Sequence, residues 1–138
     1  MKTIASICFI LTVALSTAQE LDSMSSKYPG VYTIVDEPAS FPGGLVAFYD
    51  FLDSEMGYPE TALKEGVEGR IFVELIVEEN GELTNMRVAK GIGSGCDEEA
   101  MRAIAKSSPW NPGKINGKPV RQILIQNILF KLEDGKKD

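Results

Sequence analysis

The sequence lacks histidine entirely and has only two cysteines among its 138 residues. Histidine is the commonest general base in enzymes, and zinc sites are built mainly from imidazole and thiolate groups. These shortages exclude Ser-His-Asp and Cys-His catalysis and argue against a transition-metal site. We therefore predict no catalytic residue, no bound metal and no cofactor.

Positive charge is also scarce, because 14 Lys and Arg residues stand against 20 Asp and Glu residues, which gives a net charge of −6. A surface that binds nucleic acid needs a basic footprint that neutralises phosphates. We therefore expect no nucleic-acid partner. With 43% hydrophobic and 25% charged residues, the chain has the composition of a globular protein, and its length predicts one packed domain.

A long apolar run occurs only near the N-terminus. Lys2 precedes an apolar stretch over residues 4–15, and small residues follow it just before Gln19. This pattern predicts a secretory signal peptide over residues 1–18. The stretch is shorter than the roughly 20 residues that cross a membrane, and an uncleaved anchor is the alternative. One cysteine lies in this segment, so Cys96 would be left alone without a disulfide partner.

The segments that flank the core differ from it in composition. Residues 19–27 are polar and are predicted to be a disordered lead-in, and residues 133–138 form a charged tail. Residues 28–57 form an N-terminal extension. Within it, the β-branched and aromatic residues 31–35 predict a short strand, and the apolar spacing within residues 45–55 predicts an amphipathic helix.

The central part of the chain carries the clearest strand signals. Apolar and polar residues alternate over residues 67–77, which predicts a half-buried strand. Asn80-Gly81 predicts a two-residue hairpin turn into a second strand over residues 83–89. A helix that begins with three acidic residues at 97–99 follows, and residues 120–132 form a long last strand. This order predicts an α+β fold with an antiparallel sheet.

The loop over residues 108–119 is rich in proline, glycine and asparagine, and we predict that it lacks regular structure. It contains the only tryptophan of the chain, Trp110. A lone indole in such a loop more often fills a core than binds a ligand. We therefore assign Trp110 to the edge of the core.

Two motifs resemble catalytic or cofactor sites but lack what those sites require. The glycine-rich segment 91–95 is similar to a phosphate loop, yet a dinucleotide fingerprint needs glycine where Cys96 stands, and the acids at 97–99 would repel a phosphate. The adjacent carboxylates at 78–79 and 98–99 are interpreted as solvated acids, because neighbours in a strand face opposite sides and a helix N-terminus stabilises the charged form. No nucleophile–base pair remains, so we predict a protein that is not an enzyme.

Five segments occur in a characteristic order and spacing. They are YPETA (58–62), GVEGRIFV (66–73), ENGEL (79–83), WNPGK (110–114) and NILFK (127–131). Over residues 58–132 the chain resembles the TonB C-terminal domain family, and the upstream extension, with FPGG at 41–44, resembles the Bacteroidetes branch of that family. The resemblance implies a ββαβ domain in which a helix packs on a three-stranded antiparallel sheet, here preceded by a strand–helix extension.

The resemblance also implies a function. Members of the family are periplasmic modules that recognise TonB-dependent outer-membrane receptors in energy-coupled transport, by binding an extended receptor segment, the TonB box, beside the last strand. Main-chain hydrogen bonds along an exposed sheet edge supply affinity in such strand addition. ExbB and ExbD are further expected partners if the N-terminus stays as an inner-membrane anchor. The matching edge residues are Gln126, Asn127, Ile128, Leu129, Phe130 and Lys131.

The distance between the predicted cleavage site and the domain supports an alternative. The 10 residues from Gln19 to Tyr28 span at most about 35 Å when fully extended. Full-length members of the family cross the periplasm on a long proline-rich spacer. A free periplasmic interaction module that uses the same edge without energy transduction is therefore the second interpretation.

Overall fold

The computed structural model describes residues 27–133 of the chain. The predicted signal peptide, most of the lead-in and nearly all of the charged tail lie outside this range. The chain divides into two compact units, Met1–Val31 and Tyr32–Asp138. The first unit contributes only residues 27–31 to the described part, so the fold and the site below are those of the second unit.

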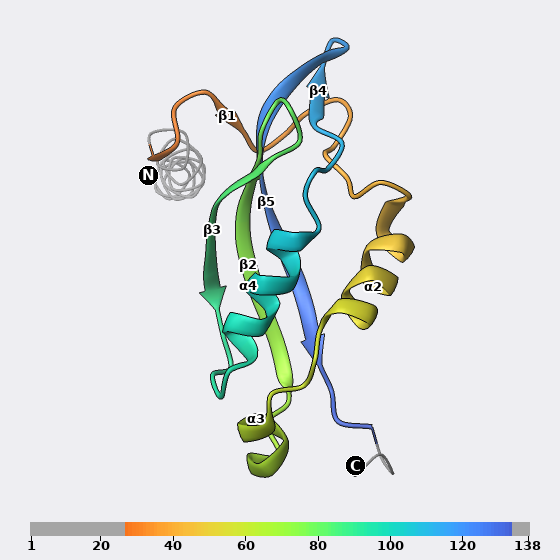
Figure 1. Cartoon of the computed structure of the whole chain (residues 1–138). Helices are drawn as coiled ribbons and strands as arrows, with labels where there is room; N and C mark the ends of the chain where they lie inside the picture. Colours follow the sequence, from red (N-terminus) through yellow and green to blue (C-terminus); the bar gives the residue numbers. More distant parts are fainter. Residues whose placement is uncertain (1–26, 134–138) are drawn as a thin grey trace, which may run out of the picture. The chain divides into compact units, whose positions relative to one another are not determined.

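The described elements include the predicted strands and helices in the expected order, together with α3 and β4 (Figure 1). They are β1 (Val31–Tyr32), α2 (Gly44–Glu55), α3 (Glu60–Glu65), β2 (Gly69–Val77), β3 (Leu83–Lys90), α4 (Cys96–Lys106), β4 (Gly113–Ile115) and β5 (Lys118–Phe130).

The sheet is antiparallel where its long strands pair, in the order β1-β5-β2-β3, and β4 also pairs with β5. The register between β2 and β5 is unbroken from Gly69 opposite Phe130 to Val77 opposite Gln122. The α+β class is confirmed, but the expectation of three strands is wrong, because the sheet has five. Of the two further strands, β1 is the short strand predicted over residues 31–35, here only 2 residues long, and β4, with 3 residues, was not predicted.

The segment from 108 to 119 is partly regular, which corrects the prediction that it is only a loop. Asn116 and Gly117 both have positive φ, 52° and 76°, as the two central residues of a type I′ hairpin turn require. They connect β4 to the start of β5, with Ile115 opposite Lys118. The proline-rich part before them is irregular, and only the last few residues pair with β5.

The turn between β2 and β3 is one residue longer than predicted. Glu78 donates its N–H to the carbonyl oxygen of Glu82 at 2.8 Å, which encloses three residues rather than two. Gly81 has the positive φ of the turn, 89°, while the Asn80 side chain accepts the N–H of Glu82 at 3.0 Å. Asn80 and Gly81 therefore make the expected hairpin with a wider loop.

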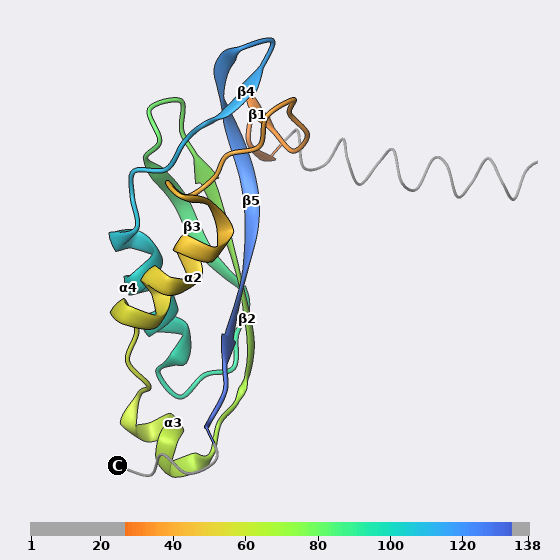
Figure 2. The same ribbon diagram turned by 90° about the vertical axis from the view of Figure 1, so that its right-hand side faces the viewer.

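The two longer helices, α2 and α4, lie side by side on one face of the sheet (Figure 2). Apolar side chains of β2, at Ile71, Val73 and Leu75, are fully buried beneath them. Trp110 is only 5% exposed and belongs to the same core cluster, so its predicted core position is confirmed. The helices contribute Phe48, Leu52, Ala100, Ala103 and Ile104 to this core.

Candidate functional site

The six residues of the predicted binding edge lie at the end of β5. Gln126 to Phe130 are the last five residues of the strand, and Lys131 follows it directly. The side chains of Ile128 and Phe130 point into the core and are 2% and 3% exposed, whereas Leu129 is 50% exposed. The stretch therefore has one face that builds the core and one face that is open.

One contact shows which backbone groups of this stretch point away from β2. The hydroxyl of Tyr49 in α2 donates to the carbonyl oxygen of Asn127 at 3.4 Å. In an antiparallel strand the N–H and C=O of one residue point to the same edge, and successive residues alternate between the edges. The backbone groups of Ile125, Asn127 and Leu129 therefore face outward.

The hairpin at the other end of β2 gives the same assignment independently. Glu78 uses its N–H to bond Glu82 on the β3 side. Because successive residues of a strand point their backbone groups to opposite edges, those of Val77 point toward β5, where Val77 pairs with Gln122. Because the direction alternates along β5, the backbone groups of the even-numbered residues bond β2. Those of the odd-numbered residues do not. Of the predicted edge residues, only the odd-numbered ones therefore have backbone groups that point away from β2.

A groove runs along this outward edge, between α2 and the end of β5. Its first part has a volume of about 350 Å³ and its second part about 150 Å³. Leu52, Asp53, Met56 and Leu129 line both parts. The remaining lining residues are Tyr49, Arg70, Asn127 and Ile128 in the first part, and Gly57, Tyr58, Phe130 and Lys131 in the second. The groove places an open space beside the outward backbone groups of the strand.

The walls of the groove differ in charge. Asp53 of α2 is exposed and lines one wall along both parts. On the sheet side, Arg70 donates from Nη1 to the side-chain oxygen of Asn127 at 2.9 Å, and Lys131 stands at the far end. The groove is therefore acidic along the helix and basic along the sheet.

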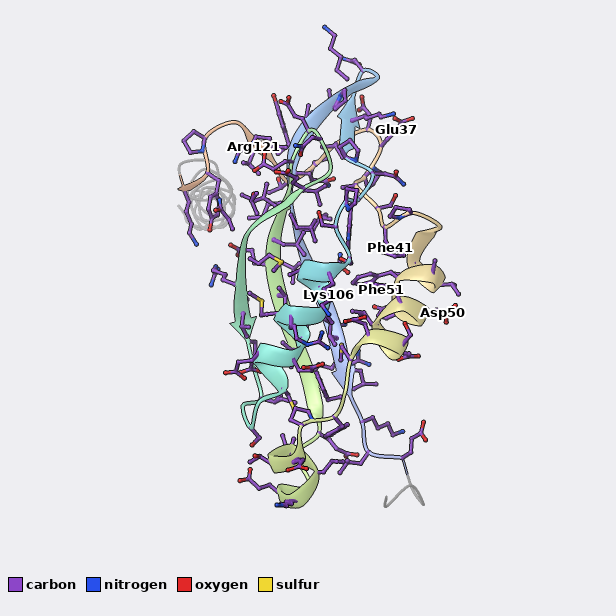
Figure 3. The ribbon with its side chains drawn as sticks, in the orientation of Figure 1. Glu37, Phe41, Asp50, Phe51, Lys106 and Arg121 are labelled. Atoms are coloured by element: carbon purple, nitrogen blue, oxygen red, sulfur yellow. The ribbon has the colours of Figure 1, made fainter. Side chains whose placement is uncertain are left out.

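The helix that forms the outer wall is held at both ends. From the segment that precedes α2, the ring of Phe41 packs at centroid distances of 5.6 Å on Phe48 and 5.5 Å on Phe51 of the helix (Figure 3). At its other end, Arg102 of α4 donates to the side chain of Glu55 at 2.9 Å and to its carbonyl oxygen at 2.7 Å. These contacts fix α2 relative to the sheet and so set the width of the groove.

The chain closely matches the family model of the Gram-negative bacterial TonB protein C-terminal, over residues 54–132, which is more than half of its length. The protein belongs to the TonB C-terminal domain family. Domains of this family are non-enzymatic and face the periplasm, and in general they interact with outer-membrane receptors and take part in coupling energy to transport. The match begins inside α2, so most of that helix precedes the family domain.

Two solution structures of the Helicobacter pylori TonB C-terminal domain have the same fold. The first is 22% identical in sequence, and its alignment spans 64% of this chain and 94% of the solved chain, with a TM-score of 0.51. The second, a longer fragment, is 21% identical, and its alignment spans 68% of this chain and 90% of the solved chain, with the same TM-score of 0.51. At these identities the similarity shows the fold alone. No curated protein sequence matches the chain.

The predicted edge lies beside the groove, but the helical wall of that groove was not predictable from the sequence. Tyr49, Asp53 and Met56 lie about 70 to 80 residues before the strand that they face, and nothing in their spacing points to it. The apolar pattern of α2 predicts Leu45, Phe48 and Leu52 on one buried face. Phe48 and Leu52 are buried, but Leu45, in the first turn of the helix, is 65% exposed. Tyr49 and Asp53 directly follow these buried residues in the sequence. This neighbourhood is the only sequence feature that places them near the core.

The other sequence motifs form no second site in residues 27–133. The carboxylate of Asp97 accepts the N–H groups of Ile92 and Gly93 at 2.9 and 3.3 Å, so the glycine-rich loop is filled by its own side chain. Cys96 is fully buried, and burial raises the pKa of its thiol, with a further contribution from Asp97 and Glu98. Within the same range there is no cluster of metal-ligating side chains and no helix long and apolar enough to span a membrane.

Glu99 ties the segment after α2 to α4. Its Oε1 accepts the N–H of Gly57 at 3.0 Å, and its Oε2 accepts the Nε–H of Arg102 at 3.1 Å. The Arg102 guanidinium and, secondly, the Gly57 N–H hold the pKa of Glu99 at about 2, below its ordinary value of 4.5. The charged form of this carboxylate therefore stabilises the fold.

We expect acid to destabilise the protein through this group. Because the pKa of Glu99 is lower in the folded state, its contribution is complete above about pH 5 and disappears as the pH falls toward 2. Measured by chemical denaturation, the free energy of unfolding should fall less between pH 5 and pH 2 in Glu99→Gln than in the wild type. Glu98→Gln, at the exposed neighbouring carboxylate, is the control and should keep the wild-type slope.

Proposed function

We propose that this TonB-family protein binds an extended N-terminal segment of an outer-membrane receptor as an added strand along the outward edge of β5, facing the periplasm, in energy-coupled transport. The observation that supports this is the groove between α2 and the end of β5, beside the outward backbone groups of Asn127 and Leu129. An open groove and free main-chain groups are the two requirements of strand addition.

The chemistry of binding follows from the alternation of the strand. The N–H and C=O groups of Asn127 and Leu129 bond the main chain of the segment, which supplies affinity whatever its sequence. The segment's side chains then alternate between the α2 wall and the open face of the sheet. The Tyr49 hydroxyl leaves the Asn127 carbonyl when the segment enters, because both use the same acceptor.

Proline at Leu129 tests this mechanism directly. Its ring removes an N–H that faces outward, so the β2 pairing is kept and a bond to the receptor segment is lost. Leu129→Pro should weaken binding of synthetic receptor N-terminal peptides by about tenfold or more, since a main-chain bond is worth about 1 kcal/mol and the ring adds a steric conflict. Isothermal titration calorimetry measures the affinity.

The matched control is Leu129→Ala, which also removes the leucine side chain but keeps the N–H. It should fold and bind peptides within a few-fold of the wild type. Circular dichroism and melting temperatures establish that both variants are folded. If a folded Leu129→Pro variant binds peptides as tightly as Leu129→Ala, the segment does not add at this edge, and the proposed function is wrong.

A further inference from the structure

The α2 wall gives the groove a chemical preference beyond main-chain pairing. Asp53 lies ahead of the family match, which begins at residue 54. One helical turn to either side of it stand Tyr49 and Met56, which also line the groove. This wall is thus an apolar surface with one carboxylate at its centre, and most of it is contributed by the N-terminal extension.

Asp53 differs from the neighbouring acid at the end of the helix. Glu55 forms ion pairs with Arg102 and Lys106, both at 2.9 Å. Asp53 forms no ion pair within residues 27–133, and it is exposed toward the groove. Arg70, one of the two cations on the sheet side with Lys131, is bonded to the Asn127 side chain instead. The negative charge of Asp53 is therefore open to a ligand.

The open face of the sheet beside the groove carries two exposed apolar side chains, on either side of Asn127 and its bond to Arg70. Ile125 is 57% exposed and Leu129 is 50% exposed, and both side chains point away from the helices. Apolar and β-branched side chains on neighbouring strands stabilise a sheet when they stand opposite one another. A strand added next to β5 would place every second side chain on this face and the others against α2.

We propose that the groove selects receptor segments that carry a lysine or arginine side chain toward Asp53, flanked by apolar side chains that turn the other way toward Ile125 and Leu129. This inference rests on the proposed function, because it assumes that the segment is an added strand. The apolar stem of the basic residue packs along Tyr49 while its charge reaches Asp53. An acidic residue at that position would meet a like charge.

Three matched peptides test the selection. The probe is the acetylated and amidated heptapeptide Val-Thr-Val-Lys-Val-Thr-Val, in which valines face one side and Thr, Lys and Thr the other. Its companions have Gln or Glu in place of Lys. At low salt the full chain should bind the Lys peptide about threefold more tightly than the Gln peptide and about tenfold more tightly than the Glu peptide, the range of an exposed ion pair. Raising the salt concentration should shrink both ratios.

The matched control variants are Asp53→Asn and Asp50→Asn. Both remove one carboxylate from α2, but Asp50 does not line the groove and points away from α4 (Figure 3). Asp53→Asn should abolish the preference for the Lys peptide and bind the Gln peptide as the wild type does. Asp50→Asn should keep the preference.

The outcomes separate this inference from the proposed function. If the three peptides bind the wild type equally and Leu129→Pro weakens all of them, strand addition stands and the charge selection is wrong. If Asp50→Asn and Asp53→Asn lower the preference equally, the charge of the whole helix acts and Asp53 is not the selective residue. If Leu129→Pro leaves peptide binding unchanged, or no peptide binds, both the selection and the proposed edge are wrong.

Discussion

Gly81→Ala is expected to lower the free energy of unfolding by about 2–5 kcal/mol, although the change adds a single methyl group in a turn. Gly81 has a φ of +89°, and a left-handed backbone with a Cβ costs about 1–2 kcal/mol. The added Cβ would also lie 2.1 Å from the carbonyl oxygen of Trp110. Overpacking of this kind costs about 1–3 kcal/mol more.

The clash is severe because the neighbour is backbone and is held in place. The N–H of Trp110 donates to the carbonyl oxygen of Gly81 at 2.9 Å, so the two segments are already bonded at this point. No side-chain rotation relieves the contact. Either the hairpin turn or the segment at Trp110 has to move, and the second movement disturbs the core.

Gly117→Ala is the matched control for this prediction. Gly117 has a similar φ of +76°, but nothing lies within 4 Å of its added Cβ. It should therefore show only the backbone cost of about 1–2 kcal/mol. Urea denaturation of both variants measures the difference. Equal destabilisation would mean that the turn at Gly81 relaxes freely and that its contact with Trp110 does not fix the fold.

The long elements were predictable because their residues repeat a pattern often enough to be recognised. In β2, Ile71, Val73 and Leu75 recur at every second position, and each is fully buried. In α4, the acids of the first turn and the buried Ala100 and Ile104 follow the rules of a helix on a sheet. Local propensity and burial agree in both elements, so the sequence alone suffices.

The short strand β4 was missed for the opposite reason. β4 has only 3 residues, Gly113–Ile115, too few to show an alternation, and it follows two prolines. What identifies it is the turn chemistry of Asn116-Gly117, the same pair that marks the β2–β3 hairpin. The pairing with β5, rather than any strand propensity of its own, makes this segment regular.

The strand that carries the proposed edge could be located from the sequence, but the direction in which its backbone groups point could not. Gln126 and Leu129 look equally suitable in the sequence, yet their backbone groups face opposite edges. The direction depends on the register with β2, which is a tertiary property. The same is true of Asp53, whose place beside the edge results from the packing of α2 on Trp110 through Phe48.

Trp110→Ala is expected to lower the free energy of unfolding by about 3–5 kcal/mol, the usual cost of removing a large buried aromatic side chain. The indole is 5% exposed and packs edge-on against Phe48 at 5.0 Å and Phe41 at 6.2 Å. Its Nε1–H donates to the hydroxyl oxygen of Ser107 at 2.8 Å. At about 4–8 °C per kcal/mol for a domain of this size, the melting temperature should fall by 10 °C or more.

Trp110→Phe separates packing from hydrogen bonding. It keeps an aromatic ring against Phe48 and loses only part of the volume and the bond to Ser107, so it should cost less than half as much as Trp110→Ala. Because Phe48 packs α2 against Trp110, the alanine variant should also increase the mobility of α2 beside the groove. Heteronuclear NMR should then show broadened amide signals for Tyr49 and Asp53. An unchanged melting temperature together with lost peptide binding would instead make Trp110 a contact residue for the partner, and would move the binding surface from the β5 groove toward β4.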